Sequence, residues 1–373
     1  MMRIVSVQMR DFRSYERAEV ALGDGLTVVY GPNGVGKSNL LEAVYFGCTG
    51  RSPRTRNDRE LVRFDAHTTR VVLALVEDGE RHELTAAFGA AQPGVQPVKR
   101  MTADGAAVER LLDVQARPLV GVFLPDRLEL LKGAPAVRRG HLDQFVAALW
   151  PGRTQTRREY SRVLAQRNAL LARIRVGRAS DATLATWDHE LASVALALRA
   201  DRAQAVELLA QPFAERAATL GCNGSVAVEY RPRSRALSAD EFVAELRERL
   251  AGDLARGYTG HGPHRDEVAI VRDGRELRVY GSQGEQRLAL LALLLAERTV
   301  LARERGTIPL MLLDDVMSEL DGQRRELLVA ELLGGGQSVI ATTDLAHVPH
   351  AAEADVTRLH VFPGNVLQEA MAA

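Results

Sequence analysis

The spacing of apolar and polar residues predicts a first third that is rich in strands. Alternating positions or short apolar runs are typical of strands, and helical spacing begins at residue 38. The predicted strands are 4–9, 18–22, 26–30, 70–76, 82–88 and 119–123, and the predicted helix is 38–47. The dipeptide Asp78-Gly79 is favoured in tight turns, so it predicts a hairpin between two of these strands.

Beyond about residue 135 the pattern becomes helical. Glycine and β-branched residues become scarce, and three helices are predicted over 137–149, 154–176 and 183–209. The segment from Arg153 to Arg178 contains eight arginines and a single acid, Glu159. Two interpretations stay open: an exposed helix face in an arginine-rich protein, or a surface for a phosphate backbone.

Strands and helices alternate in the last part of the chain. Strands are predicted over 226–230, 310–313 and 338–341, a hairpin over 268–279, and helices over 239–254, 283–303 and 321–332. Such alternation favours an α/β fold with a largely parallel sheet.

Composition narrows the class without pointing to a partner. The 373 residues carry no net charge and 46% of them are apolar, which is ordinary for a globular chain and provides no global field that would attract nucleic acid. The longest apolar run, 288–296, is far shorter than the roughly 20 residues that span a bilayer. We therefore expect a cytoplasmic protein that has no membrane association. The two cysteines provide neither a disulfide framework nor a metal motif.

A glycine-rich loop follows the apolar strand 26–30 and opens the predicted helix. In this context glycines let backbone amides face phosphate groups, Lys37 reaches the β- and γ-phosphates, and Ser38 coordinates magnesium. The helix N-terminus adds its positive end. The predicted nucleotide-binding residues here are Gly31, Pro32, Asn33, Gly34, Val35, Gly36, Lys37, Ser38 and Asn39.

Two aspartates follow the apolar run 310–313. A buried strand that ends in carboxylates can deliver them to the ligand edge of a sheet. Asp314 would then hold magnesium, through water, and Asp315 would act as general base on the attacking water. The alternative is a pair of surface aspartates after a strand. The next residues, 318–321, either cap the following helix or form a dimer-contact loop.

A third segment gains its meaning from the other two. Ser282, Gln283 and Gly284 precede an apolar helix, and taken alone they indicate only a helix start. A free helix N-terminus with serine and glycine also binds phosphate well. In the presence of a phosphate loop, this segment is predicted to complete the nucleotide site of a second copy.

These motifs together resemble the ABC-type ATPase heads of the SMC class. Further runs are similar to the RecF family of bacterial recombination mediators, namely 11–15, 39–43, 50–54, 132–143 and 262–266. There are departures from the ABC pattern. Asp315 stands where a glutamate is usual, the strand 338–341 lacks the switch histidine that follows it in transporters, and Pro125-Asp126 stands where a glutamine is expected.

The resemblance implies a fold and a division of the chain. The fold is α/β, an ABC-type ATPase head with a mixed or parallel sheet, a phosphate-loop helix, an antiparallel β subdomain and an inserted helical lobe. Residues 1–133 would form the N-terminal half with the Walker A loop, and 134–255 the mainly helical lobe. Residues 256–373 would supply the signature, the Walker B aspartates and the D-loop.

The resemblance also implies an activity. With ATP and Mg²⁺ as cofactors, two heads would close face to face, clamp gapped or junction DNA, and help RecO and RecR load RecA. Slow, DNA-stimulated hydrolysis through Lys37, Asp314 and Asp315 would release the clamp, in the nucleoid. Thr342 or Thr343 is a candidate γ-phosphate sensor, and Arg54 a candidate link between DNA and the site.

Three other classes fit less well. A transporter-type ATPase subunit would carry a Leu-Ser-Gly-Gly-Gln signature and a switch histidine. A long SMC-like structural protein would have hundreds of heptad residues between its halves, whereas 135–255 is short and has no heptads. A nuclease with an ATPase head would need an acidic domain after the last strand.

Overall fold

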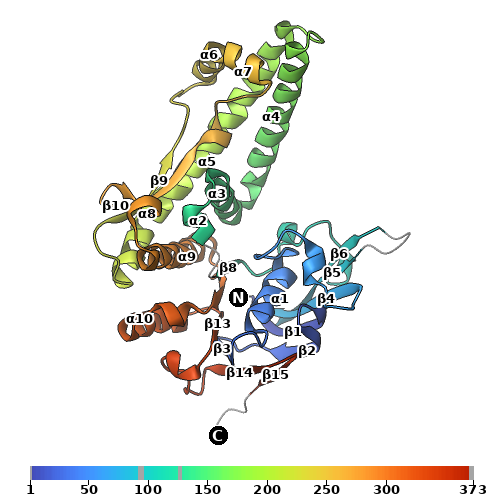
Figure 1. Cartoon of the computed structure of the whole chain (residues 1–373), viewed down its shortest axis with the longest axis vertical. Coiled ribbons are helices and arrows are strands. Elements are labelled where there is room, and N and C mark those ends of the chain that lie inside the picture. The colour runs from blue at the N-terminus through green and yellow to red at the C-terminus, as the bar shows by residue number, and fades with distance from the viewer. Residues whose placement is uncertain (1, 91–95, 125–127, 369–373) are drawn as a thin grey trace. The chain divides into compact units, whose positions relative to one another are not determined.

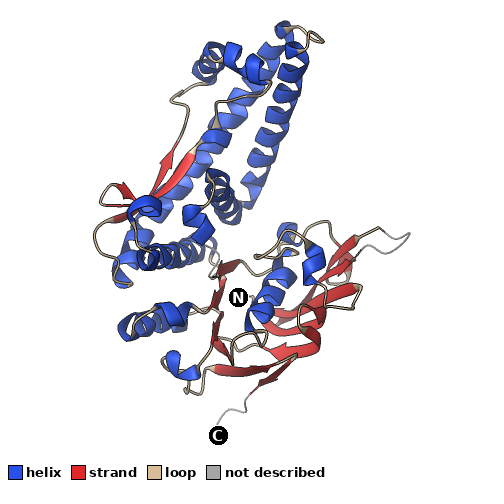
Figure 2. Ribbon diagram, in the orientation of Figure 1, coloured by secondary structure: helices blue, strands red, loops and turns tan. Residues whose placement is uncertain are grey.

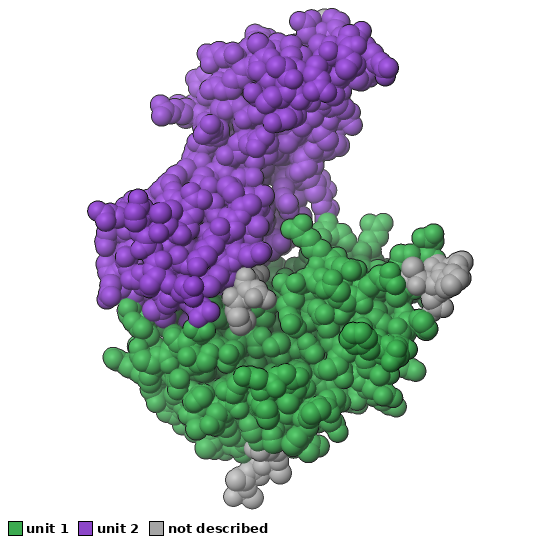
Figure 3. All heavy atoms as spheres, in the orientation of Figure 1, with its two compact units in different colours: residues 1–127, 219–221, 301–373 green, residues 128–218, 222–300 purple. Residues whose placement is uncertain are grey.

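The computed structural model describes residues 2–90, 96–124 and 128–368. The chain divides into two compact units (Figure 3). Unit 1 comprises Met1–Arg127, Thr219–Gly221 and Leu301–Ala373, and unit 2 comprises Leu128–Ala218 and Cys222–Val300. Residues 222–300 thus group with the helices by contact, whereas the three-part division by motif remains a prediction. No helix among the described residues is long and apolar enough to cross a membrane.

The first sheet of unit 1 contains the predicted parallel strands (Figure 1). Its order is β15-β14-β3-β13-β12-β8, and all neighbours are parallel except β14 and β15. The strands are β3 (Leu26–Tyr30), β8 (Val120–Phe123), β12 (Leu310–Asp314), β13 (Ser338–Thr342), β14 (Thr357–Phe362) and β15 (Asn365–Gln368). Every residue of β12 and β13 is buried, and for β12 this burial is the one predicted from its apolar run. The α/β fold is confirmed, and β14 and β15 are additions that the apolar pattern did not predict.

The second sheet of unit 1 is antiparallel, with order β2-β1-β4-β5-β6-β7. Figure 2 draws the strands in red. Its strands are β1 (Arg3–Phe12), β2 (Tyr15–Ala21), β4 (Thr68–Glu77), β5 (Glu80–Gly89), β6 (Val98–Ala103) and β7 (Ala106–Ala107). The hairpin turn lies at Asp78-Gly79, where both residues have positive φ, as predicted.

Helix α1 (Lys37–Thr49) is the centre of the unit 1 core. Its buried apolar side chains belong to one cluster with residues from both sheets, including Val7, Leu73, Leu312 and Val339. The approach to β4 is close, because a Cβ on Gly47 would lie 2.6 Å from the Leu73 side chain. The helix that begins at the phosphate loop is therefore fixed on both sides by packing.

Unit 2 contains long helices and a small antiparallel sheet, β11-β10-β9. Its helices are α2 (Glu129–Lys132), α3 (Pro135–Leu149), α4 (Thr154–Arg175), α5 (Leu184–Thr219), α6 (Ala239–Glu248), α7 (Leu250–Arg256), α8 (Leu277–Tyr280) and α9 (Gln283–Arg305), the last of which continues into unit 1. Its strands are β9 (Val226–Arg231), β10 (Glu267–Arg272) and β11 (Arg275–Glu276). The remaining helix, α10 (Gly322–Leu333), belongs to unit 1.

Three predicted boundaries in unit 2 are wrong. Helix α5 continues past Pro212 to Thr219, because Phe213 and Ala217 are buried and packing outweighs the proline. The helix predicted over 239–254 is interrupted at Arg249, and its second part, α7, places the Asp253 carboxylate in the interior. The second strand of the hairpin predicted over 268–279 has only two residues before α8 begins.

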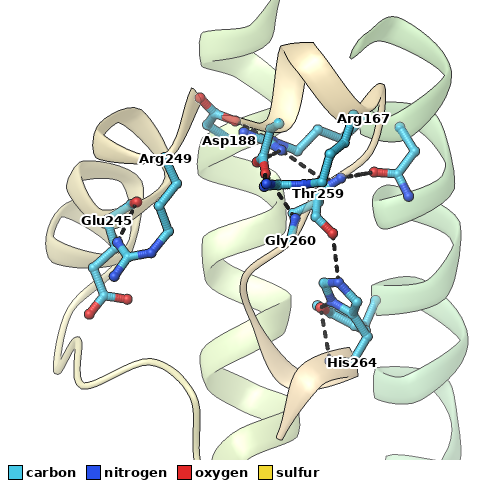
Figure 4. Close-up of polar contacts among 11 residues, drawn as sticks. Arg167, Asp188, Glu245, Arg249, Thr259, Gly260 and His264 are labelled. Atoms are coloured by element: carbon cyan, nitrogen blue, oxygen red, sulfur yellow. Dashed lines mark hydrogen bonds and ion pairs between the residues drawn. The ribbon is translucent and has the colours of Figure 1, made fainter. Parts of the chain in front are cut away.

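The arginine-rich helix α4 has one arginine, Arg167, among its buried side chains (Figure 4). Arg167 is fully buried, and its guanidinium donates to Asp188 Oδ1 at 2.7 Å, Asp253 Oδ2 at 3.0 Å and Thr259 Oγ1 at 2.7 Å. These partners come from α5, α7 and the loop after α7. One cation therefore ties four segments of unit 2 together.

Other arginines of this segment are also paired. Arg153, Arg157 and Arg162 form ion pairs with Asp201, Asp143 and Glu190, respectively. Partners of opposite charge reduce the positive potential that a phosphate backbone would meet. For these residues the structure favours the ion-paired helix face over a surface for nucleic acid.

We predict that Arg167→Met lowers the free energy of unfolding of unit 2 by about 3–5 kcal/mol, because the buried Asp188 loses its ion pair and the buried Asp253 keeps only Arg256. Both tryptophans, Trp150 and Trp187, lie in unit 2, so urea unfolding followed by tryptophan fluorescence reports this unit. The matched control is Arg162→Met, whose exposed ion pair is expected to contribute at most about 1 kcal/mol. Equal effects of the two substitutions would contradict the assignment.

Candidate nucleotide site

The phosphate loop between β3 and α1 requires glycine for steric reasons. Gly31 and Gly36 have φ of 149° and 121°. A Cβ on Gly31 would lie 2.5 Å from the Val361 carbonyl oxygen, and one on Gly36 would lie 2.9 Å from the Tyr15 hydroxyl. The N-cap residue of α1 is Gly36, and it makes no side-chain capping bond. The first amides of α1 are therefore left to an anionic ligand.

Lys37 sits inside this loop. Its Nζ donates to the carbonyl oxygens of Gly31 at 2.6 Å and Pro32 at 2.8 Å, and only 7% of the residue is exposed. Burial lowers the pKa of Lys37, and the charges of Asp315 and Asp314 oppose this shift. The predicted lysine and the two predicted aspartates thus lie within electrostatic reach of one another.

Asp314 ends β12 and meets the start of α1. It is 6% exposed, and burial raises the pKa of its carboxyl group, while a hydrogen bond from Ser38 and the charges of Arg54 and Lys37 act in the opposite direction. The two residues predicted to hold magnesium, Ser38 and Asp314, are therefore in contact.

A hydroxyl and a carboxylate are the hard oxygen ligands that Mg²⁺ prefers. Among residues 2–90, 96–124 and 128–368, no group of three or more His, Cys, Asp or Glu residues is arranged to hold a metal. A magnesium ion at Ser38 and Asp314 would therefore complete its shell with phosphate oxygens and water, the arrangement typical of this ion in nucleotide sites. The donor set fits the predicted ion.

Asp315 has an unusual backbone that fixes the direction of its side chain. It adopts the left-handed conformation, φ 50° and ψ 25°, although it is not glycine. Its N–H donates to the Ala341 carbonyl at 3.0 Å, and its carbonyl accepts from Ser318 Oγ at 2.8 Å. Its Oδ1 is buried without a hydrogen-bond partner among the described residues. Backbone strain and an unpaired carboxylate oxygen are features that fit the predicted role of Asp315 as a general base acting on water.

The loop after Asp315 leads directly into α10. Asp321 Oδ1 accepts a hydrogen bond from the Arg324 N–H at 2.9 Å, so Asp321 caps that helix. The predicted capping role is confirmed, and the dimer-contact role remains a prediction. Thr342 is buried at the end of β13, and its hydroxyl donates to the Asp344 carbonyl at 3.1 Å. Its proposed sensing role stays open, and Pro125-Asp126 lies outside the described residues.

Sequence reasoning missed a buried acid that binds several side chains next to the phosphate loop. Glu42 lies on α1 and is fully buried. Its carboxylate accepts from Arg13 Nε at 2.9 Å and Nη2 at 2.7 Å, from Ser52 Oγ at 2.6 Å and from Arg54 Nη1 at 3.2 Å. Arg54 also donates to Asn39 Oδ1 at 3.1 Å. The signal in the sequence was a glutamate within an otherwise apolar helix face, which requires cationic partners.

The turn between β1 and β2 contacts the same loop. Asn39 Nδ2 donates to Ser14 Oγ at 3.0 Å, and Tyr15 Oη donates to the Gly36 carbonyl at 3.0 Å. Burial raises the pKa of Tyr15 well above its ordinary value, so the hydroxyl remains a donor at neutral pH. The antiparallel sheet is thus connected to the phosphate loop by side-chain hydrogen bonds.

The predicted signature begins α9 with reciprocal capping bonds. Ser282 Oγ accepts from the Glu285 N–H at 3.3 Å, and Glu285 Oε2 accepts from the Ser282 N–H at 2.8 Å. Ser282, Gln283 and Gly284 are exposed. They belong to unit 2, whereas the phosphate loop and both aspartates belong to unit 1. The helix start is confirmed, and its contact with a nucleotide remains a prediction.

The fold and the site together define an ABC-type ATPase head of the SMC class. A protein-family model described as an AAA domain matches residues 6–99. A crystal structure of an Smc head bound to the C-terminal winged-helix domain of ScpA aligns over 99% of this chain with a TM-score of 0.59 at 16% identity, a likeness of fold alone.

Closer relatives fix the family. The DNA replication and repair protein RecF of Chloroflexus aurantiacus is 38% identical, with 96% of this chain and 97% of that protein covered, and RecF of Heliobacterium modesticaldum is 35% identical with 93% of each covered. The solved structure of the recombination mediator protein RecF with ATP, in the RecFOR pathway, aligns over 99% of this chain and 98% of that one, with a TM-score of 0.85 and 27% identity. The chain belongs to the RecF family.

We predict that Lys37→Met weakens ATP binding by about 10- to 150-fold, the value of a missing charge-assisted hydrogen bond of roughly 1.5–3 kcal/mol. Titration with a fluorescent ATP analogue measures the change. Lys132→Met, at an exposed lysine of α2, is the matched control and is expected to bind ATP like the parent. Normal ATP binding by Lys37→Met would remove the assignment of the loop.

We predict that Asp315→Asn retains ATP binding but lowers single-turnover hydrolysis by about 10²- to 10⁴-fold, as expected for the loss of a general base. Asp315→Glu restores a carboxylate on a longer side chain and is expected to hydrolyse ATP at least as fast as the parent. Quench-flow with radiolabelled ATP measures both rates. Hydrolysis by Asp315→Asn at the parent rate would show that another group activates the water.

Proposed function

We propose that this chain is an ATP-dependent DNA-binding protein of recombinational repair in which two copies close around ATP. The observation that carries the proposal is the distribution of the site. Lys37, Ser38, Asp314 and Asp315 come together in unit 1, whereas Ser282 is an exposed, capped helix start in unit 2. A second copy that presents its Ser282 to the γ-phosphate would complete the cage around the triphosphate.

The residues of unit 1 support a simple order of events. The triphosphate would replace the loop carbonyls as the partner of the Lys37 ammonium, and the first amides of α1 would bind its oxygens. Bound Mg²⁺ would neutralise phosphate charge beside Ser38 and Asp314. Asp315 would orient the attacking water through its unpaired Oδ1. Loss of the γ-phosphate would remove the ligand that Ser282 binds, and the two copies would separate.

The relatives suggest what the switch acts on. They are named DNA replication and repair proteins, and the RecF structure with ATP is placed in the RecFOR pathway. We propose that the closed dimer binds gapped DNA or the junction of single and double strands, that it helps RecO and RecR load RecA, and that slow, DNA-stimulated hydrolysis releases it. A transporter-type subunit would not respond to DNA, so a DNA effect on ATP turnover separates these functions.

Sedimentation velocity tests the proposal. The protein is run alone, with ATP, with a non-hydrolysable ATP mimic, and with each nucleotide plus a gapped duplex. The proposal requires a dimer with the mimic and a longer-lived DNA complex with the mimic than with ATP. A protein that is saturated with the mimic and remains monomeric, with and without DNA, would refute it.

We predict that Ser282→Arg binds ATP with the affinity of the parent but forms no ATP-dependent dimer. The large arginine side chain would prevent the start of α9 from reaching the γ-phosphate that is bound to the other copy. Ser161→Arg makes the same change at an exposed position of α4 and is expected to dimerise normally. The readouts are nucleotide titration and sedimentation with the mimic. Dimerisation of Ser282→Arg at the parent level would exclude the signature from the site.

A further inference from the structure

The strand register of the antiparallel sheet aligns arginines on its solvent face. Arg10 of β1 lies directly opposite Arg17 of β2 and opposite Arg70 of β4. Arg70 is opposite Ala87 of β5, and Ala87 is opposite Arg100 of β6. Residues that face each other in an antiparallel pair point to the same side of the sheet. The four arginines therefore form one row across β2, β1, β4, β5 and β6, which we call the arginine row (strands labelled in Figure 1).

The arginine row is exposed, and its guanidinium groups form no ion pairs within the described residues. All four arginines are exposed. None of their guanidinium groups has a hydrogen bond or ion pair with any residue in the described ranges, in contrast to the paired arginines of α4. Glu19 is two residues from Arg17 on β2 and accepts from Gln8 at 3.1 Å, and Glu83 accepts from Thr85 at 3.4 Å, but neither carboxylate forms an ion pair with an arginine of the row.

Such an arrangement is unfavourable for the folded protein by itself. Like charges directly opposite each other on neighbouring strands destabilise a sheet. A row of unpaired cations therefore has no role in holding the sheet together, since the apolar cluster on the opposite face does that. A polyanion on this face would convert the repulsion into binding energy.

The dimensions and the neighbouring residues favour a nucleic-acid backbone. Adjacent strands are about 4.8 Å apart, so the row extends over roughly 19 Å, a length along which double-stranded DNA presents several phosphates. Beside the row on β4, β5 and β6, two residues along each strand, Thr68, Gly89 and Thr102 are small or polar, and Val72 and Val98 are apolar. None of these five is an aromatic side chain that would anchor a protein partner.

We propose that the arginine row is a docking surface for the phosphate backbone of double-stranded DNA. The proposal rests on the DNA-binding function proposed above and assigns it a surface in unit 1. The row lies near the β1–β2 turn, whose Ser14 and Tyr15 hydrogen-bond to Asn39 and Gly36. DNA bound to this face would therefore contact β1 and β2, the strand pair whose turn contacts the phosphate loop.

The test compares two triple variants that remove the same charge. Arg10→Gln, Arg70→Gln and Arg100→Gln are combined in the first. The second combines Arg162→Gln, Arg231→Gln and Arg249→Gln. All three arginines have ion-pair partners; Arg162 and Arg249 are exposed and Arg231 is half-buried. Affinity for a fluorescent duplex is measured over a series of KCl concentrations with the ATP mimic present. The slope of log K against log[KCl] falls by about 0.9 for each phosphate that the protein no longer neutralises.

The row variant is expected to bind duplexes of any sequence more weakly, with a slope smaller than that of the parent by about three, while the paired-arginine variant keeps the parent slope. The single variant Arg70→Gln is expected to lower the slope by about one. Thermal unfolding checks the fold: the row variant is expected to melt no lower than the parent, because repulsion is removed.

Several outcomes would overturn the proposal. One is an unchanged slope in the row variant, and another is an equal loss in the two triple variants. A fall in melting temperature that accounts for the loss of binding would mark the row as structural. If polyglutamate competes with the duplex at equal charge and loses binding equally in the row variant, the surface suits an acidic protein instead. If the parent binds no duplex at all, the proposed function fails as well. If the parent binds the duplex and the row variant binds it with the same affinity and slope, only this inference is refuted.

Discussion

The parallel register of β3, β13 and β12 is the constraint on which the nucleotide site depends. Asp314 is paired with Ala341, and Ala341 with Val29, so the three strands end level with one another. The phosphate loop begins with the residue that follows β3, and Asp315 is the residue that follows β12. Because the carboxyl ends of parallel strands meet at one edge of the sheet, residues some 280 positions apart in the chain come into contact as Ser38 and Asp314.

A second layer of contacts holds that edge in place. The buried carboxylate of Glu42 gathers Arg13, Ser52 and Arg54 behind the loop, and Tyr15 binds the Gly36 carbonyl. Arg13 and Tyr15 come from the turn of the antiparallel sheet whose other face carries the arginine row. The same two strands therefore contribute to the nucleotide site and to the surface that we propose for DNA. This shared element gives a physical route by which DNA could influence hydrolysis.

Patterns of neighbouring residues were sufficient to predict those elements whose conformation depends on neighbouring residues. The strand predicted over 26–30 is β3, and the loop that follows it has the positive-φ glycines that the motif requires. The Asp78-Gly79 turn and the capping role of Asp321 were also visible, because turns and caps depend on a few neighbouring residues. Asp314 and Asp315 were found because a buried strand leads into them.

The features that the sequence did not reveal depend on contacts between distant segments. Strand β14 is short, and its polar–apolar alternation over 358–361 was not recognised as a strand; its pairing with β3 and the stacking of His360 on Tyr30 are tertiary contacts. The arginines of α4 looked like a surface until Arg167 proved to be buried. The arginine row could not be predicted, because it exists only in the register of four strand pairings.

The central claim is that one copy cannot complete its own nucleotide site. Mixing the Lys37→Met and Ser282→Arg proteins tests it most directly, because a mixed dimer contains one site with an intact phosphate loop and an intact signature. ATP hydrolysis is measured for each protein alone and for the mixture. We predict little ATP hydrolysis by either protein alone. In the mixture we predict that each mixed dimer hydrolyses ATP at about half the rate of a parent dimer, because one of its two sites is intact. A mixture no more active than the sum of its parts, or a Ser282→Arg protein that hydrolyses ATP normally by itself, would contradict the account.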